Sequence, residues 1–191
     1  MTTQPYPVTP TSAQVAGAGA QPAHPGLRYM SAYPAELQIQ VGDLIATGKL
    51  ANHLRKRYPV AHGVRSDKAL YDYLTDLRSS HLRKNEALSK VVFDSKIHVV
   101  RHALGLHTSV SRVQGSKLKA KHEIRIASFF RQVPLEFLRM IAVHELAHIK
   151  EKAHDKAFYQ LCQHMEPHYH QLEFDVRLYL TWLEHTAEPL W

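Results

Sequence analysis

The sequence predicts an α+β domain, because segments with the pattern of short strands are grouped in the middle of the chain and helical segments flank them. The middle region, residues 91–130, contains three β-branched and loosely alternating segments. On either side, apolar residues recur at the three- and four-residue spacing of amphipathic helices. With 191 residues, 45% of them hydrophobic, the chain has room for one domain of ordinary size and a tail.

The N-terminal segment, residues 1–30, is expected to be a disordered leader, and residues 31–191 are expected to form the domain. Up to Gly26 the leader is rich in Pro, Thr, Ala, Gln and Gly and has no periodic apolar face. It lacks the features of a secretory signal, and no apolar run in the chain approaches the length of about 18 residues that spans a membrane. A single cysteine, Cys162, excludes an internal disulfide and fits a reducing compartment. We therefore predict a soluble cytoplasmic protein without a membrane partner.

Three helices are predicted before the strands. The first covers residues 35–47, and Gly48 is a plausible stop. A short basic helix follows through Leu50 and Leu54. Ser66 is predicted to cap the third helix. The core-facing residues of that third helix are Leu70, Tyr73, Leu74 and Leu77.

Three strands are predicted next, at residues 97–100, 108–113 and 124–129, with Gly115 in the turn between the last two. The net charge is +7, which favours anionic partners. Positive charge is most concentrated around the turn, in Arg112, Lys117, Lys119, Lys121 and Arg125. On adjoining strands these residues could bind the phosphates of a triphosphate, and Arg112 is the best single candidate. The alternative is an ordinary solvated hairpin.

After the strands, the sequence predicts a buried helix with two histidines on one face. Pro134 suits its first position, and apolar residues surround almost all of the segment 135–149. His144 and His148 are four residues apart. A helix therefore places them one above the other, where two ring nitrogens can reach one ion.

Two further residues complete a candidate zinc site. Glu145 lies near enough to reach a water on the ion without binding the ion itself. His154 follows where the chain could turn back and offer a third nitrogen. Three protein ligands and one open position define a catalytic zinc, whereas a fourth ligand closes a structural zinc. The alternative is a pair of core histidines satisfied by hydrogen bonds, but that alternative leaves the buried Glu145 carboxylate without a partner.

Two helices are predicted to follow the metal helix. Asp155 is a candidate cap for the first of them, and Pro167 ends it. The core face of this helix consists of Phe158, Leu161, Cys162 and Met165. The last helix turns Leu172, Val176, Tyr179 and Leu183 inward. His164, His168 and His170 suggest a second metal site, but Pro167 interrupts the helix that would align them.

The motif His144-Glu145-Leu146-Ala147-His148, followed by HDKAFY at residues 154–159, resembles the YgjP-like metal-dependent hydrolases of the zincin type. Shorter matching segments are DKALY at 67–71, GLHT at 105–108, SRVQG at 111–115, LRMI at 138–141 and HMEP at 164–167. The resemblance covers residues 33–185. It implies a zincin-like fold, in which a small antiparallel sheet packs beside the HExxH helix, with N- and C-terminal helices. It also implies Glu145 as general base and the three histidines as ligands.

The resemblance implies two competing activities. The family is named for its metallopeptidase-like domain, whereas relatives are credited with hydrolysing UTP to UMP and pyrophosphate. Many relatives carry a Trp-Gly-Ser motif in the strand region, where this chain has RVQGS at residues 112–116, so their substrate contacts cannot be copied. The histidine spacing also matches metzincins, but Glu151 stands where their turn has glycine, which argues against that clan.

We therefore predict a zinc-dependent hydrolase in which Glu145 accepts the proton of the attacking water. The favoured substrate is a nucleoside triphosphate, UTP, accompanied by magnesium, with Arg112 and the neighbouring lysines on its phosphates. The first alternative is a zinc metallopeptidase whose strand region binds an extended peptide by β-augmentation. The second is a nucleic-acid-binding module with a non-catalytic metal, supported by the net charge and by the basic segment 49–57. This second alternative lacks the interleaved aromatic and basic residues typical of single-strand binders.

Overall fold

The computed structural model describes residues 27–82, 87–97, 105–114 and 117–191, which divide into two compact units. The first unit comprises residues 27–57 and Glu173–Pro189. The second comprises Tyr58–Leu172 with the last two residues of the chain. The expected leader lies outside the described residues as far as residue 26. Leu27 and Met30 are buried, so ordered packing begins before residue 31.

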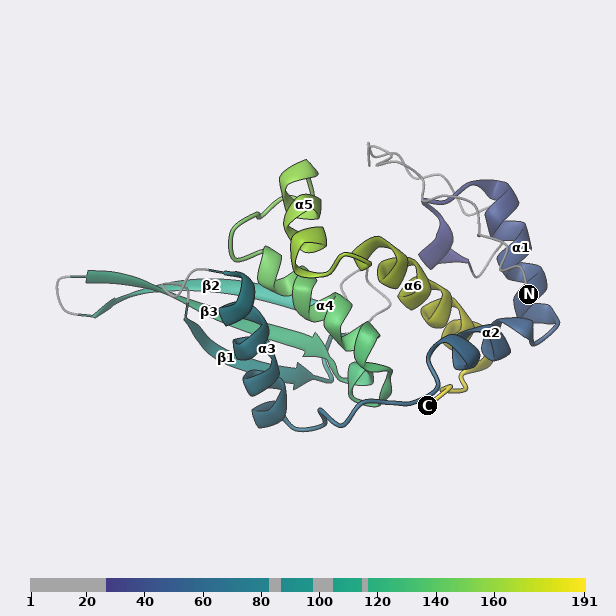
Figure 1. Cartoon of the computed structure of the whole chain (residues 1–191), viewed down its shortest axis with the longest axis horizontal. Helices are drawn as coiled ribbons and strands as arrows, with labels where there is room; N and C mark the ends of the chain where they lie inside the picture. The colour runs from purple at the N-terminus through teal and green to yellow at the C-terminus, as the bar shows by residue number, and fades with distance from the viewer. Residues whose placement is uncertain (1–26, 83–86, 98–104, 115–116) are drawn as a thin grey trace. The chain divides into compact units, whose positions relative to one another are not determined.

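The first unit is helical (Figure 1). It contains η1 (Arg28–Met30), α1 (Ala35–Ala46), α2 (Lys49–Arg57) and all but the first turn of α6 (Tyr169–Thr186). Gly48 ends α1 as predicted, and its φ of +67° is a conformation that glycine adopts at little cost. Asp175 on α6 is 1% exposed and lies 3.4 Å from the Arg57 guanidinium, so the buried carboxylate is paired with a cation.

The second unit contains a three-stranded sheet in the order β1-β3-β2. Its strands are β1 (Leu88–Asp94), β2 (Gly105–Gln114) and β3 (Lys117–Ala127). β2 and β3 pair antiparallel, from Gly105 opposite Ile126 to Gln114 opposite Lys117. β1 pairs with the other edge of β3 in the parallel direction, ending with Asp94 opposite Ala127.

The predicted α+β class is confirmed, but the predicted antiparallel sheet is wrong, because β1 runs parallel to β3. In the sheet, β3 lies between β1 and β2, so β1 is not beside the strand that follows it in the sequence. Ten residues separate the end of β1 at Asp94 from the start of β2 at Gly105, more than the two residues that a tight antiparallel hairpin needs. β1 itself was not predicted, and the predicted strand at residues 97–100 is not tested. β1 ends at Asp94, Ile97 follows it, and residues 98–100 lie outside the described residues.

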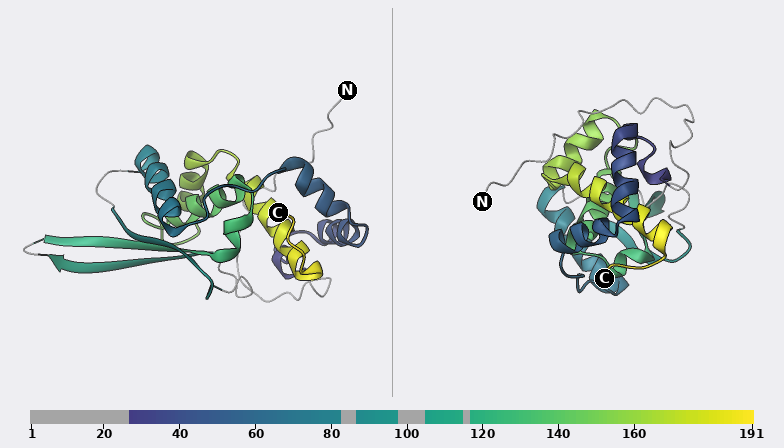
Figure 2. Two further views of the ribbon diagram at one scale, coloured as in Figure 1. Left: turned by 90° about the horizontal axis from the view of Figure 1, so that it is seen from below. Right: turned by 90° about the vertical axis from the view of Figure 1, so that its right-hand side faces the viewer.

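Helices α3 (Asp67–His81), α4 (Leu135–Ala147) and α5 (Lys156–Met165) lie on one face of the sheet (Figure 2). α3 packs against β1, and α4 packs against β2 and β3. Ser66 caps α3 as predicted, because its hydroxyl accepts from the backbone N–H of Ala69 at 3.1 Å. The core between helices and sheet is formed by Leu70, Leu74, Val91, Phe93, Ile124, Ile126, Leu138 and Ile141.

α4 is buried, as its sequence predicts. From residue 137 to residue 147, every residue except Arg139 and His144 is buried. Pro134 precedes the helix at the N-cap position instead of being its first residue. The 3-10 helix η3 (Ser128–Gln132) leads from β3 into this segment. Among the helices of the described residues, none has the length and apolar composition needed to cross a membrane.

Candidate metal centre

The C-terminal end of α4 carries the first two histidines of the candidate site. His144 lies in the last turn, and His148 follows as the C-cap with a helical φ of −63°. The four-residue spacing keeps both rings on one helix face. As a result, their Nε2 atoms lie 3.3 Å apart.

The third histidine comes from the loop between α4 and α5. The backbone N–H groups of Lys150 and Glu151 both donate to the carbonyl of Ala147, so the chain turns directly after the helix. His154 thereby returns to the end of α4, and its Nε2 lies 3.1 Å from the Nε2 of His144. One ring nitrogen from each of the three histidines lies within 4.8 Å of the other two, a group that could hold a metal ion.

Hydrogen bonds to the opposite ring nitrogens orient two of these imidazoles. The Nδ1 of His148 lies 3.0 Å from the carbonyl oxygen of Glu151, and the Nδ1 of His144 lies 2.7 Å from the Tyr169 hydroxyl. A carbonyl can only accept, so His148 carries its proton on Nδ1 and the lone pair on Nε2. This arrangement suits metal binding, in which the remote nitrogen of a histidine ligand is usually held by a hydrogen bond.

The spacing of the nitrogens fits a tetrahedral metal. Ligands about 2.0–2.1 Å from a tetrahedral zinc are about 3.4 Å from one another. The measured separations between His144 and its two partners are 3.3 and 3.1 Å. Lone pairs aimed at one point repel each other unless a cation lies between them. Imidazole ligands suit zinc and also copper, iron and nickel. The three histidines therefore fit a bound metal ion, but they do not determine which metal it is.

Phe158 of α5 packs against all three rings. Its ring centroid lies 4.9 Å from that of His144 and 4.7 Å from those of His148 and His154. Phe158 is fully buried. Asp155 caps α5 as predicted, with its carboxylate 3.1 Å from the backbone N–H of Phe158. This one hydrogen bond therefore holds Phe158, which packs against the three imidazoles, and Asp155, which follows His154 in the sequence.

Glu145, beside His144 in the sequence, is 2% exposed, and its Oε2 atom is buried without a hydrogen-bond partner. Burial raises the pKa of this carboxyl to about 8. A nearby cation favours the charged form of a carboxyl and lowers its pKa. The unpartnered oxygen is therefore a second observation, independent of the histidines, that fits a cation in this region.

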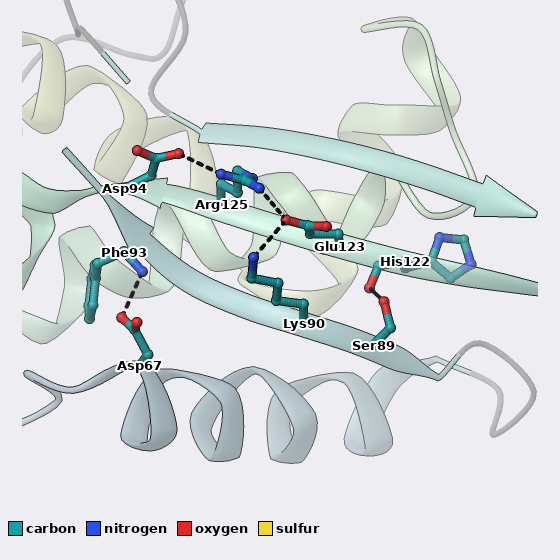
Figure 3. Close-up of polar contacts among 8 residues, drawn as sticks. All are labelled: Asp67, Ser89, Lys90, Phe93, Asp94, His122, Glu123 and Arg125. Carbon is teal, nitrogen blue, oxygen red and sulfur yellow. Dashed lines mark hydrogen bonds and ion pairs between the residues drawn. The ribbon is translucent and has the colours of Figure 1, made fainter. Parts of the chain in front are cut away.

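The predicted phosphate-binding residues lie on the paired strands β2 and β3. Positions 117, 119 and 121 alternate along β3, and the backbone register sets Arg112 opposite Lys119, so these four positions share one face of the paired strands. The side chains at these positions lie outside the described part of the structure. Arg125 differs, because it already has acidic partners: its guanidinium lies 3.0 Å from Asp94 and 2.7 Å from Glu123 (Figure 3). A phosphate at Arg125 would have to compete with both carboxylates.

Two other histidines of the C-terminal region, His164 and His170, lie against aromatic rings. The ring of His164 lies 5.7 Å from that of His81, and the ring of His170 lies 5.4 Å from that of Tyr159. Within the described part of the chain, the group of three or more possible metal ligands is the one formed by residues 144, 148 and 154. The suggested second metal site, on His164, His168 and His170, has no such group.

Comparison with known proteins places the chain in a family. The family model described as "YgjP-like, metallopeptidase domain" matches residues 76–177, which include all three histidines. This chain belongs to the YgjP-like family. A relative from Escherichia coli (strain K12), named UTP pyrophosphatase, is 60% identical over 157 residues, which cover 82% of this chain and 94% of the relative. No solved structure matches. As a member of this family, the YgjP-like chain is a metal-dependent hydrolase.

Three contacts of the YgjP-like site do not follow from sequence reasoning. Phe158 was predicted as a core residue, but its contact with all three imidazoles was not expected. The carbonyl of Glu151 and the hydroxyl of Tyr169 were not predicted to bind the ring nitrogens. Every residue has a backbone carbonyl, so the sequence cannot show which carbonyl will bind His148. Tyr169 lies 25 residues after His144, a separation that no local spacing rule covers.

Proposed function

We propose that this YgjP-like protein hydrolyses UTP to UMP and pyrophosphate at a zinc ion held by His144, His148 and His154. The observation that carries the proposal is the convergence of three Nε2 atoms at the end of α4, the helix on which Glu145, the residue after His144, has a buried oxygen without a partner. The substrate comes from the relative named UTP pyrophosphatase, because 60% identity over 94% of that protein favours a shared reaction.

In the proposed reaction Glu145 is the general base. A zinc ion bound by the histidines supplies Lewis-acid chemistry, which makes water more acidic and stabilises negative charge on phosphoryl oxygens. Glu145 accepts a proton from the attacking water, whose oxygen forms a bond to the α-phosphorus. The bond from that phosphorus to the bridging oxygen breaks, and pyrophosphate leaves with the electron pair. The apolar surroundings of Glu145 limit competing solvent around the carboxylate.

The cations of β2 and β3 are proposed to bind the triphosphate. Arg112 and Lys119 are paired in the register, and Lys117 and Lys121 flank Lys119 on alternate positions of β3. Several cations on one face would neutralise the negative charge that remains on the phosphate oxygens of a magnesium-bound nucleotide. Arg125 is the weakest member of the predicted set, because Asp94 and Glu123 already occupy its guanidinium.

Hydrolysis of UTP by the purified protein loaded with zinc tests the reaction, with UMP and pyrophosphate measured separately. We expect both products in equal amounts, and a loss of at least about 100-fold in kcat for Glu145→Gln with zinc still bound. Release of orthophosphate alone would place the cleavage at another phosphorus. A Glu145→Gln variant as active as the wild type would remove Glu145 from the mechanism.

Substitutions on the strands test the phosphate contacts. For Arg112→Gln and Lys119→Gln we expect KM for UTP to rise about tenfold, because each loses a hydrogen bond between charged groups. For Arg125→Gln we expect a smaller rise. Lys68→Gln is the matched control, since this exposed lysine pairs with Asp72 on α3. An unchanged KM in both Arg112→Gln and Lys119→Gln would exclude this face as the phosphate site.

A metallopeptidase is the second candidate, and one structural observation favours it. β2 is an edge strand of the sheet, and α4, which carries the HExxH motif, packs against it. An extended peptide could pair with such an edge beside the metal helix. Incubation with unfolded proteins under the same conditions separates the two candidates: proteolysis without pyrophosphate release from UTP would reverse their order.

Two earlier predictions remain proposals. A nucleic-acid-binding module with a non-catalytic metal would show salt-sensitive binding to DNA that survives Glu145→Gln. We also propose a cytoplasmic location, because a chain with one cysteine, Cys162, cannot form an internal disulfide and fits a reducing compartment. Fractionation of cells that produce the protein would test that location directly.

A further inference from the structure

Tyr169, the first residue of α6, lies against His144. It is fully buried, and its hydroxyl oxygen lies 2.7 Å from the Nδ1 of His144. The two rings are nearly parallel, with centroids 6.4 Å apart and an angle of 19° between their planes. A buried phenol needs a hydrogen-bond partner, and His144 supplies one.

The other nitrogen of His144 decides the direction of this hydrogen bond. Its Nε2 lies 3.3 Å from the Nε2 of His148 and 3.1 Å from that of His154. If the phenol donated to Nδ1 of a neutral imidazole, the ring proton would sit on Nε2 and block an ion from the shared point. If Nδ1 donates to the phenol oxygen, Nε2 keeps its lone pair for an ion. The buried hydroxyl can therefore select the tautomer that binds metal.

The backbone position of Tyr169 is set by the turn between α5 and α6. The N–H of Tyr169 donates to the carbonyl of Glu166 at 2.9 Å, and the Glu166 carboxylate accepts from the N–H of His168 at 3.0 Å. Arg139 of α4 holds this turn from the other side. Its Nε donates to the Glu166 carboxylate, and its Nη2 donates to the carbonyl of Met165 at 3.0 Å.

These contacts form a closed path that begins and ends on α4. Arg139 binds the turn through Glu166, the turn places Tyr169, and Tyr169 returns to His144 five residues after Arg139. We infer that Tyr169 is a positioning residue for the metal centre, that it fixes the ring orientation and tautomer of His144, and that Arg139 and Glu166 act through it. This inference rests on the metal site of the proposed function and names a residue outside the ligand set.

The test is the zinc affinity of Tyr169→Phe, measured by competition with a chelator. Phenylalanine keeps the buried ring and removes the hydroxyl. We expect the zinc affinity to fall at least about tenfold, as is typical when the hydrogen-bond partner of a histidine ligand is lost. We also expect a changed visible spectrum of the cobalt(II)-loaded protein, because the ring of His144 is no longer held.

Tyr71→Phe is the matched control. The Tyr71 hydroxyl donates to the carbonyl of Leu88 at 3.2 Å in the same unit, so this variant also loses one tyrosine hydrogen bond. We expect its zinc affinity and cobalt spectrum to equal those of the wild type. The thermal midpoint of each metal-free variant is measured as well, and we expect the larger shift for Tyr169→Phe because Tyr169 is fully buried whereas Tyr71 is 37% exposed. Zinc affinities are then compared at a temperature well below both midpoints, which separates loss of positioning from loss of stability.

Glu166→Gln extends the test and does not depend on the folding of Tyr169→Phe. Alone, it should lower zinc affinity by less than Tyr169→Phe does. Combined with Tyr169→Phe, it should lower the affinity no further, because both changes act on one path.

Wild-type zinc affinity in Tyr169→Phe, or in Glu166→Gln if Tyr169→Phe does not fold, would overturn the inference. A wild-type protein that binds no zinc would instead refute the metal centre of the proposed function, and this inference with it.

Discussion

The imidazole of His148 donates through Nδ1 to the backbone carbonyl oxygen of Glu151, 3.0 Å away. The contact uses the backbone, so the identity of the side chain at position 151 should matter little to the site. We expect Glu151→Ala to bind zinc within a factor of about two of the wild type, well below the tenfold loss typical of a removed side-chain partner. A chelator competition measures this, and a large loss would show that the Glu151 carboxylate itself contributes.

Removal of His154 should abolish tight zinc binding without unfolding the protein. His154 is exposed and lies in a loop, so His154→Ala creates no cavity in the core. The wild type should be stabilised by zinc by about 2.7 kcal/mol when free zinc is 100 times its Kd. Thermal unfolding with and without zinc should show that gain in the wild type and not in His154→Ala. An equal gain in both proteins would remove His154 from the ligand set.

Ser66 and Asp155 both cap helices, but only Asp155 lies beside a predicted metal ligand, so replacing each of them separates an effect on stability from an effect on zinc binding. Ser66→Ala and Asp155→Ala each remove a side chain that accepts from a backbone N–H at 3.1 Å. Each should lower the free energy of unfolding of the zinc-free protein by about 1 kcal/mol, as measured in urea. Only Asp155→Ala should also weaken zinc binding, because Asp155 adjoins His154 and fixes the start of α5. Equal zinc affinities in the two variants would contradict this.

His62 should make stability depend on pH in the acidic range. This ring is 6% exposed, accepts from the N–H of Val64 at Nδ1, and donates from Nε2 to the carbonyl of Phe130 at 2.7 Å. Burial lowers its pKa below the usual value of 6.5, and the Phe130 carbonyl opposes the change in part. The folded protein therefore binds this proton less readily than the unfolded chain does. The contribution of neutral His62 to the free energy of unfolding is therefore fully present above pH 6.5, and it is lost as the pH falls through the lowered pKa of the folded state.

Urea unfolding of the wild type and of His62→Gln at pH 7.5 and pH 5 isolates this contribution. Other histidines titrate in both proteins, so the difference between the two pH dependences belongs to His62. We expect the free energy of unfolding to fall less between the two pH values in His62→Gln. Parallel changes in both proteins would show that protonation of His62 is not linked to folding.

The parts of the fold that depend on neighbouring residues were predictable from sequence. Ser66 and Asp155 cap helices through contacts three residues away, and His144 and His148 share a face because a helix fixes their spacing. The apolar composition around α4 likewise predicts its burial. Local rules are sufficient for each of these features, including the presence of three candidate ligands.

The parts that depend on distant residues were not predictable. The parallel pairing of β1 with β3 depends on where the whole chain carries β1, and β-branched residues near position 97 give a competing strand signal. Arg125 looked available for phosphate until Asp94, on another strand, was seen to pair with it. Tyr169 of α6 meets His144 through a turn that is held by Arg139, which lies on the same helix as His144. Such contacts exist only after the elements have packed.

The central position of β3 implies an order of assembly. β2 and β3 are separated by two residues, so their hairpin can form in about 1–10 μs, whereas residues 95–116 separate β1 from β3. Phe93 of β1 donates its backbone N–H to the Asp67 carboxylate at the start of α3 at 3.0 Å (Figure 3). We therefore expect β1 and α3 to pack together onto the β2–β3 hairpin after that hairpin has formed. Backbone amides of β1 should consequently become protected from solvent exchange after those shared by β2 and β3.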